Sequence, residues 1–302
     1  MLSTLPSVVR DVSGMVLPNF YILGAQKCGT TWLASMLRQH SEVFIPRQKE
    51  IHYFNRAENY GRGREWYAKQ FLGCGSALAV GDATPDYLAV TWTAEGAQVA
   101  KRIFDLTPDA RFIVSLRNPA VRAVSALLHH IRAGRLPPET DLDAQLDLML
   151  SGCQPTHGVL EIGQYGRQIR IFRHHFPADR FAILIYEEDI ALEKRATLRA
   201  LCRFLNVRPD YSFRRVHAVH NPTLRTQRGL RLLRHLPGGR GNRLVWWAER
   251  LGLGKRLAVS TETLQRLHAY YEVDKAELRA LIGRDLATWQ TDSPDGFEVT
   301  DR

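Results

Sequence analysis

Short apolar runs recur along the chain, and each has the length of a buried strand. They cover residues 20–23, 43–45, 78–81, 111–116 and 181–186. Between these runs, apolar residues return every three or four positions, which is the spacing of a helix that buries one face. The predicted helices cover residues 32 to about 40, 64–72, 94–106, 119–132, 141–150, 163–176, 192–205 and most of 263–289.

Strands that alternate with helices predict an α/β fold with a mainly parallel central sheet flanked by helices on both faces. With 302 residues and no internal repeat, we expect a single domain, with a core at about 18–207 and C-terminal loops and helices at about 208–302. In such sheets, ligands bind outside the carboxyl ends of the strands. Polar residues fall at those ends: Lys27, Glu50, Asp82, Arg117 and Tyr186.

A glycine-bounded loop joins the first predicted strand to the first predicted helix, with the sequence Gly24-Ala-Gln-Lys-Cys-Gly-Thr-Thr31. Backbone N–H groups, a helix N-terminus and a lysine together form a site for an anion such as phosphate. Loops that bind nucleoside triphosphates place the lysine directly after the second glycine. Here Thr30 holds that place and Lys27 precedes Gly29 by two residues, so Lys27 is expected to reach an oxygen nearer the bond to be broken. An ordinary strand-to-helix turn is the alternative.

A second segment repeats this logic about ninety residues later, with the sequence Arg117-Asn-Pro-Ala-Val-Arg-Ala-Val-Ser125. Arg117 leaves a strand, Pro119 suits the first position of a helix, and Ser125 lies two turns into that helix. We expect Arg117 and Ser125 to meet one phosphate. Two such segments together suggest one ligand with two separated phosphate groups.

Composition narrows the classes of ligand. The net charge is +10, from 41 Lys and Arg against 31 Asp and Glu, which favours an anionic ligand, a nucleic acid or an acidic membrane surface. The four cysteines lie far apart and form no CxxC pair, so we expect reduced thiols and no zinc site. The N-terminus has no apolar run of signal-peptide or membrane-span length, and a soluble, cytoplasmic protein is expected.

The two anion-binding segments resemble those of sulfotransferases that use 3′-phosphoadenosine 5′-phosphosulfate (PAPS), in particular the bacterial and glycan-type, heparan-sulfotransferase-like members. The resemblance covers residues 20 to about 207 and implies the P-loop-kinase-like sulfotransferase fold, with PAPS as donor, 3′-phosphoadenosine 5′-phosphate as product, and no metal. It implies that Lys27 contacts the bridging oxygen of the phosphosulfate and that Arg117 and Ser125 bind the 3′-phosphate. The 5′-phosphate would be held by Cys28, Gly29, Thr30, Thr31 and Trp32.

The resemblance also implies an acceptor site. The segment Lys49-Glu-Ile-His-Tyr-Phe54 is similar to the glycan-type pattern, which makes Glu50 the candidate general base and His52 the second candidate. We expect Asp82, Thr84 and Tyr87 to line the acceptor pocket. Heparan-type enzymes carry a lysine near the first of these positions, where this chain has Asp82 and Ala83, so a sulfated polyanion is less favoured. The resemblance also implies that a C-terminal segment with Arg225, Arg228 and Gly229 closes over the bound nucleotide.

The expected acceptor is a hydroxyl of a glycan, a glycolipid or a secondary metabolite. A phenol or small alcohol with a His base is the alternative. Residues 221–256 hold nine Lys or Arg against one acid, Glu249, and are interpreted as a solvated basic face or as a contact for a membrane-surface or lipid-linked acceptor. A nucleotide kinase is disfavoured by Thr30, and no motif that reads nucleic acid is present.

Overall fold

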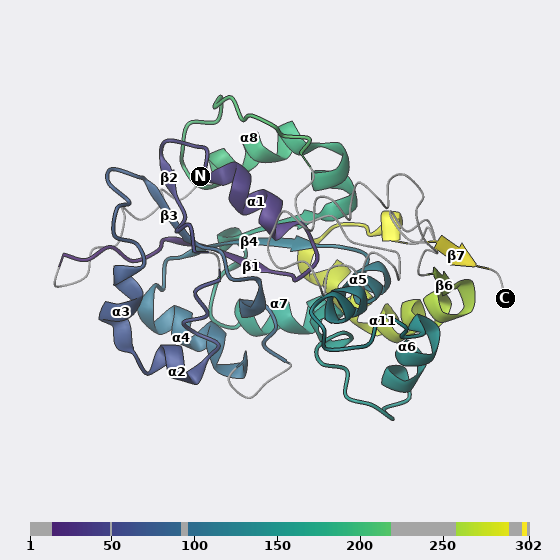
Figure 1. Cartoon of the computed structure of the whole chain (residues 1–302). Coiled ribbons are helices and arrows are strands. Elements are labelled where there is room, and N and C mark those ends of the chain that lie inside the picture. Colours follow the sequence, from purple (N-terminus) through teal and green to yellow (C-terminus); the bar gives the residue numbers. More distant parts are fainter. Residues whose placement is uncertain (1–13, 49, 92–95, 219–257, 290–297, 301–302) are drawn as a thin grey trace. The chain divides into compact units, whose positions relative to one another are not determined.

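The computed structural model describes residues 14–48, 50–91, 96–218, 258–289 and 298–300. The chain, drawn in Figure 1, divides into two compact units. The first unit comprises residues 1–117, 165–220 and 277–284, and the second comprises residues 118–164, 221–276 and 285–302. The boundaries of the predicted single domain stay a prediction.

The first unit is built on a five-stranded sheet with the order β2-β3-β1-β4-β5. Every neighbouring pair is parallel, as expected for strands joined by helices. The register of β1 against β4 shifts between Ile22 and Gly24, so the last residue of β1 pairs out of step with the residues before it. The strands are β1 (Phe20–Gly24), β2 (Val43–Phe44), β3 (Ala79–Asp82), β4 (Arg111–Leu116) and β5 (Phe181–Ile185).

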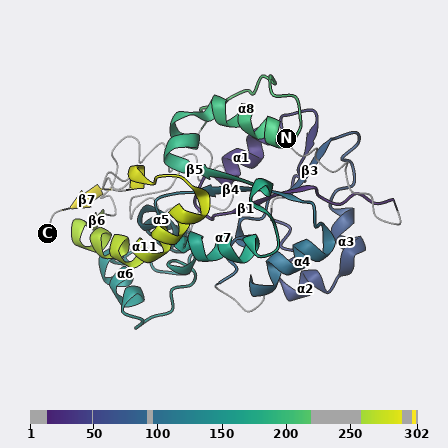
Figure 2. The ribbon, with the colours of Figure 1, turned by 180° about the vertical axis from the view of Figure 1, so that it is seen from behind.

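One face of the sheet is covered by α1 (Thr30–Leu37) and α8 (Lys194–Phe204), which lie together in both views (Figures 1 and 2). The core there joins apolar side chains of both helices to side chains of β1 and β4 such as Ile22 and Ile113. The predicted first helix ends three residues early, at Leu37. His40 follows, and its ring contacts the carbonyl of Arg208 and the ring of Tyr211, which the continued helix would prevent.

Short helices cover the other face (Figures 1 and 2), and a cluster of aromatic side chains packs there. Tyr21 and Phe112 of the sheet meet Phe54, Phe172 and Phe176 at ring centroid distances between 4.5 and 5.9 Å. Aromatic contacts of this kind bury much apolar area. The helices are α2 (Ala57–Tyr60), which the sequence analysis did not predict, and α3 (Gly63–Lys69), α4 (Val99–Leu106) and α7 (Tyr165–Arg173), each shorter than its prediction.

A π-helical turn, η5 (Tyr186–Leu192), follows β5, in a stretch where the sequence analysis predicted no helix before about residue 192. Two of its carboxylates, those of Glu188 and Asp189, bind the guanidinium of Arg284. The Asp189 distance is 2.8 Å, and Asp189 also accepts the backbone N–H of Ile185 at 2.5 Å. The turn is therefore fastened by a residue almost one hundred positions later.

The second unit packs α5 (Pro119–Arg132) and α6 (Leu142–Leu150) with the first part of α11 (Thr261–Ile282). Pro119 takes the first turn of α5, as predicted, and Asn118 caps the helix by accepting two backbone N–H groups. Arg122 is fully buried and donates to the carbonyl of Val159. A two-stranded parallel sheet joins β6 (Ala258–Ser260) to β7 (Glu298–Thr300).

The close contact between β1 and β3 gives a test of the core. A Cβ at Gly81 would lie 2.2 Å from Cζ of Phe20, whose Cα is its register partner. Gly81→Ala is expected to lower the free energy of unfolding by about 1–3 kcal/mol, measured by urea denaturation, because overpacked cores shift their backbone.

The matched control adds Phe20→Leu to Gly81→Ala. The double variant should recover part of the loss, since the two residues are in contact and their effects are not additive. Wild-type stability in Gly81→Ala would contradict the packing described.

Candidate active site

The loop of residues 24–31 is fastened to β4 from both sides. The N–H of Ala25 donates to the carbonyl of Ser115 at 2.8 Å, and the Ser115 hydroxyl donates to the carbonyl of Cys28 at 2.5 Å. Lys27 and Gly29 both have left-handed backbone, with φ of 71° and 83°. Gly29 is the N-cap of α1, so the loop ends at the helix N-terminus. The order of strand, loop and helix N-terminus is as the sequence predicted, while anion binding by this loop stays a prediction.

Tyr186, the first residue of η5, lies between this loop and Arg117. A Cβ at Gly29 would stand 3.1 Å from the Tyr186 ring, so the ring packs against the bare glycine backbone. The guanidinium carbon of Arg117 lies over the same Tyr186 ring, 4.9 Å from the ring centroid. Sequence analysis placed Tyr186 at a strand end and gave it no role. Its position directly after β5 was the available signal.

Two side chains of the predicted loop site face the interior. Cys28 is fully buried, with its sulfur 3.6 Å from the hydroxyl of Tyr165, and its N–H donates to the carbonyl of Ala25 at 3.2 Å. The indole N–H of Trp32 donates to the carbonyl of Val216 at 2.9 Å. These contacts fix the loop and α1, while direct contact of Cys28 and Trp32 with a nucleotide stays a prediction.

Ser125 belongs to the second unit. Its side chain is buried within α5, and its hydroxyl has no hydrogen-bond partner among the described residues. A buried hydroxyl ordinarily has a partner, so this atom suits a ligand oxygen. Joint binding of one phosphate by Ser125 and Arg117 stays a prediction. Arg225, Arg228, Gly229 and the basic segment 221–256 lie outside the described residues.

The loop of residues 50–54 has unusual backbone. Glu50 and His52 have φ of 69° and 54°, in the left-handed region that non-glycine residues seldom adopt. Such residues cost on the order of 1–3 kcal/mol each and cluster at functional sites. Together with Lys27, they make three of the six non-glycine residues with positive φ in the described part of the chain.

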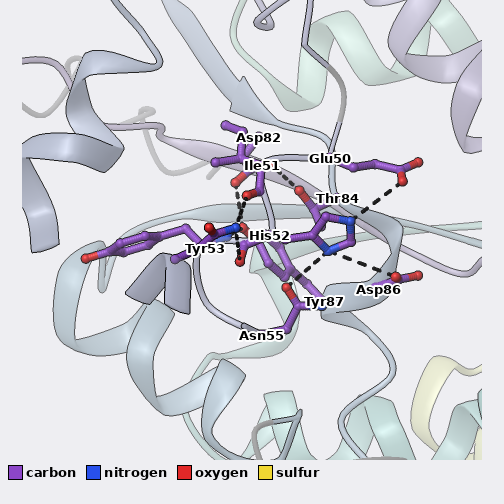
Figure 3. Close-up of polar contacts among 10 residues, drawn as sticks. Glu50, Ile51, His52, Tyr53, Asn55, Asp82, Thr84, Asp86 and Tyr87 are labelled. Carbon is purple, nitrogen blue, oxygen red and sulfur yellow. Dashed lines mark hydrogen bonds and ion pairs between the residues drawn. The ribbon is translucent and has the colours of Figure 1, made fainter. Parts of the chain in front are cut away.

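The imidazole of His52 lies between two carboxylates, as Figure 3 shows. Nε2 is 3.8 Å from Oε2 of Glu50, and Nδ1 is 4.0 Å from Oδ2 of Asp86. The side-chain oxygen of Asn55 is 3.3 Å from the same Nδ1. The Glu50 side chain is 40% exposed and the His52 side chain 9%, so Glu50 is the more accessible of the two to a substrate. Asp86 and Asn55 were missed by sequence analysis.

Asp82, Thr84 and Tyr87 form a fully buried network (Figure 3). The Asp82 carboxylate accepts from the hydroxyls of Thr84 at 2.7 Å, Tyr87 at 2.9 Å and Tyr67 at 2.8 Å. Burial raises the pKa of Asp82, and the three donated hydrogen bonds oppose that rise. Direct contact of these side chains with an acceptor stays a prediction. Their observed contacts include one another, the hydroxyl of Tyr67 and the 50–54 loop.

No group of three or more His, Cys, Asp or Glu side chains in the described part of the chain is arranged to hold a metal ion. No helix within it is long and apolar enough to cross a membrane.

Comparison with known proteins identifies the family. A family model described as "Sulfotransferase domain" matches residues 17–229. The membrane-associated sulfotransferase kil1 of Dictyostelium discoideum is 33% identical over 141 residues, which are 44% of this chain and 28% of that protein. Human heparan sulfate glucosamine 3-O-sulfotransferase 5 is 24% identical over 199 residues, 65% of this chain and 55% of that protein. This chain therefore spans less than two thirds of the length of these relatives.

The crystal structure of a sulfotransferase from Alicyclobacillus acidocaldarius has a TM-score of 0.67 and 27% identity, covering 91% of this chain and 100% of that one. The predicted fold class, an α/β fold with a mainly parallel sheet of the P-loop-kinase-like sulfotransferase type, is confirmed. Since the family model matches well over half of its residues, the chain belongs to the sulfotransferase family.

Proposed function

We propose that this protein transfers a sulfuryl group from PAPS to a hydroxyl of a glycan, a glycolipid or a secondary metabolite, by in-line displacement with Glu50 as general base. The observation that carries the proposal is the 24–31 loop, in which Lys27 and Gly29 have left-handed backbone at the start of α1. A PAPS-dependent enzyme needs an anion site of this kind at a strand end.

The loop residues fit a 5′-phosphate. The first N–H groups of a helix have no partner within the helix, and the helix dipole favours negative charge there. At Gly29, a side chain would meet the Tyr186 ring, so glycine keeps the backbone close to the site. When bound, PAPS supplies the sulfuryl group. Lys27 then donates to the bridging oxygen, where negative charge grows as the S–O bond breaks.

The 3′-phosphate is assigned to Arg117 and Ser125. The guanidinium group of an arginine offers several hydrogen-bond donors in a fixed plane. Its stacking on Tyr186 holds that plane in place. The Ser125 hydroxyl is buried and unused by other described residues, which supports the assignment.

We assign to Glu50 the removal of the proton from the acceptor hydroxyl, because its carboxylate is the more exposed member of the Glu50–His52 pair. The relatives named for heparan sulfate support a glycan acceptor. Heparan-type enzymes carry a lysine near the position of Asp82 and Ala83, and this chain has none there, which favours an acceptor that is not itself heavily sulfated. A phenol or small alcohol with His52 as base is the second candidate. The likeness to kil1, named as membrane-associated, supports testing lipid-linked acceptors too.

The two-phosphate site predicts selectivity among nucleotides. We expect 3′,5′-adenosine bisphosphate to bind about tenfold to a hundredfold more tightly than AMP in calorimetry. The reason is that charge-assisted hydrogen bonds to the 3′-phosphate contribute about 1.5–3 kcal/mol. In Arg117→Gln most of this preference should disappear. Equal affinity of the wild type for both nucleotides would refute the 3′-phosphate assignment.

Lys27→Ala and Lys27→Met test the leaving-group contact. Turnover should fall by about 10²–10³, and bisphosphate affinity by less than about tenfold, because the contact strengthens in the transition state. Turnover is measured with labelled PAPS and pooled extract fractions, and the sulfate adduct is identified by mass spectrometry. Weaker binding with intact turnover would show that Lys27 only binds the donor.

Glu50→Gln separates the two candidate bases. The amide matches the carboxylate in shape, so folding and bisphosphate binding should persist while the rate falls by about 10²–10⁴. His52→Asn and His52→Gln should reduce the rate less, through lost support of the carboxylate. Both sets are assayed on the same acceptor, with nucleotide binding as the control. Inactive His52 variants beside a near-normal Glu50→Gln would make the imidazole the base and favour a small-molecule acceptor.

A further inference from the structure

The backbone of the 50–54 loop is held by side chains of three other segments. The Asn59 amide donates to the carbonyls of Ile51 at 3.0 Å and His52 at 3.3 Å. The N–H of Tyr53 donates to the hydroxyl of Tyr87 at 2.9 Å. In a fourth bond, the guanidinium of Arg102 donates to the carbonyl of Phe54 at 2.7 Å. No strand in the described part of the chain pairs with the loop, so these bonds hold its two left-handed residues in place.

The Tyr87 bond differs from the others because a buried carboxylate fixes its direction. A carboxylate has no hydrogen to donate, so the hydroxyls around Asp82 point their protons at it. Tyr87 donates to Oδ2 of Asp82, and its oxygen is then free to accept the N–H of Tyr53. Burial and the nearby Asp82 carboxylate raise the pKa of Tyr87, which keeps the proton on its oxygen. Each bond in this chain therefore polarises the next.

We propose that Tyr87 is a positioning residue, whose hydroxyl, oriented by Asp82, fixes the N–H of Tyr53 and so the loop that carries Glu50 and His52. This inference rests on the proposed function, in which Glu50 is the base. It gives Asp82 and Tyr87 a role behind the loop, consistent with their full burial. Displacing a catalytic group by about 1 Å can cost about a hundredfold in rate. The bond at the N–H of Tyr53 lies three residues after Glu50, so its loss is expected to lower turnover.

Tyr67 provides a matched control. Its hydroxyl donates to the same Asp82 oxygen at 2.8 Å, and it is equally buried. Its ring stacks on Tyr53 at a centroid distance of 4.3 Å, but among the described residues its hydroxyl makes no hydrogen bond to the loop backbone. Tyr67→Phe and Tyr87→Phe thus each remove one hydroxyl from Asp82, and only the second also removes the acceptor for Tyr53.

The experiment compares Tyr87→Phe with Tyr67→Phe in the full chain. Hydrogen exchange at the Tyr53 amide, followed by NMR, should be at least about tenfold faster in Tyr87→Phe and unchanged in Tyr67→Phe. With an acceptor in hand, kcat should fall by about 10–100-fold in Tyr87→Phe and by less than about threefold in Tyr67→Phe. Bisphosphate affinity should stay the same in both, and their melting temperatures should fall by similar amounts.

Equal losses of kcat in the two variants would overturn the proposal, and so would wild-type exchange at Tyr53 in Tyr87→Phe. The exchange measurement needs no substrate, so it tests the positioning role even if no sulfate transfer is found. Should Tyr87→Phe not fold, Asp82→Asn takes its place, because the amide can donate to Tyr87 and release its orientation. Faster exchange at Tyr53 is expected there, and an unchanged rate would count against the proposal.

Discussion

The pairing of β1 with β4 is the constraint on which the proposed donor site depends. The register shift after Ile22 brings the N–H of Ala25 to the carbonyl of Ser115, and the Ser115 side chain then binds the loop from the other side. Without this pairing, the 24–31 loop would have no rigid support, and Arg117, which leaves the same β4, would have no fixed distance to it. The sheet therefore places both groups before any ligand arrives.

Strain and burial are combined in the same region. Lys27, Glu50 and His52 have backbone that costs free energy, and fully buried contacts lie beneath them: Ser115 under the first loop, and Asp82 with Tyr87 under the second. Strained conformations persist only where the surroundings determine them. In this region, the Glu50 carboxylate is exposed while the His52 imidazole beside it is nearly buried.

Much of the architecture could be predicted because it depends on local patterns. The five strands, the helix that begins at Pro119, and the glycine loop before α1 follow from apolar spacing and turn chemistry. The left-handed backbone of Glu50 and His52 could not be predicted, since their residue types prefer other regions. It depends on bonds such as that between Tyr53 and Tyr87, which are 34 residues apart. The same holds for Tyr186, whose neighbours Gly29 and Arg117 come from distant parts of the sequence.

The ion pairs of Arg284 have a consequence for synthesis on the ribosome. The first unit is assembled from three stretches of chain, and the last of them, residues 277–284, supplies the guanidinium that holds Glu188 and Asp189. Translation from the N-terminus has supplied the residues of all five strands of the sheet by Ile185, almost a hundred residues before Arg284 is added. The turn that carries Tyr186 is thus completed late in translation, well after the sheet it follows.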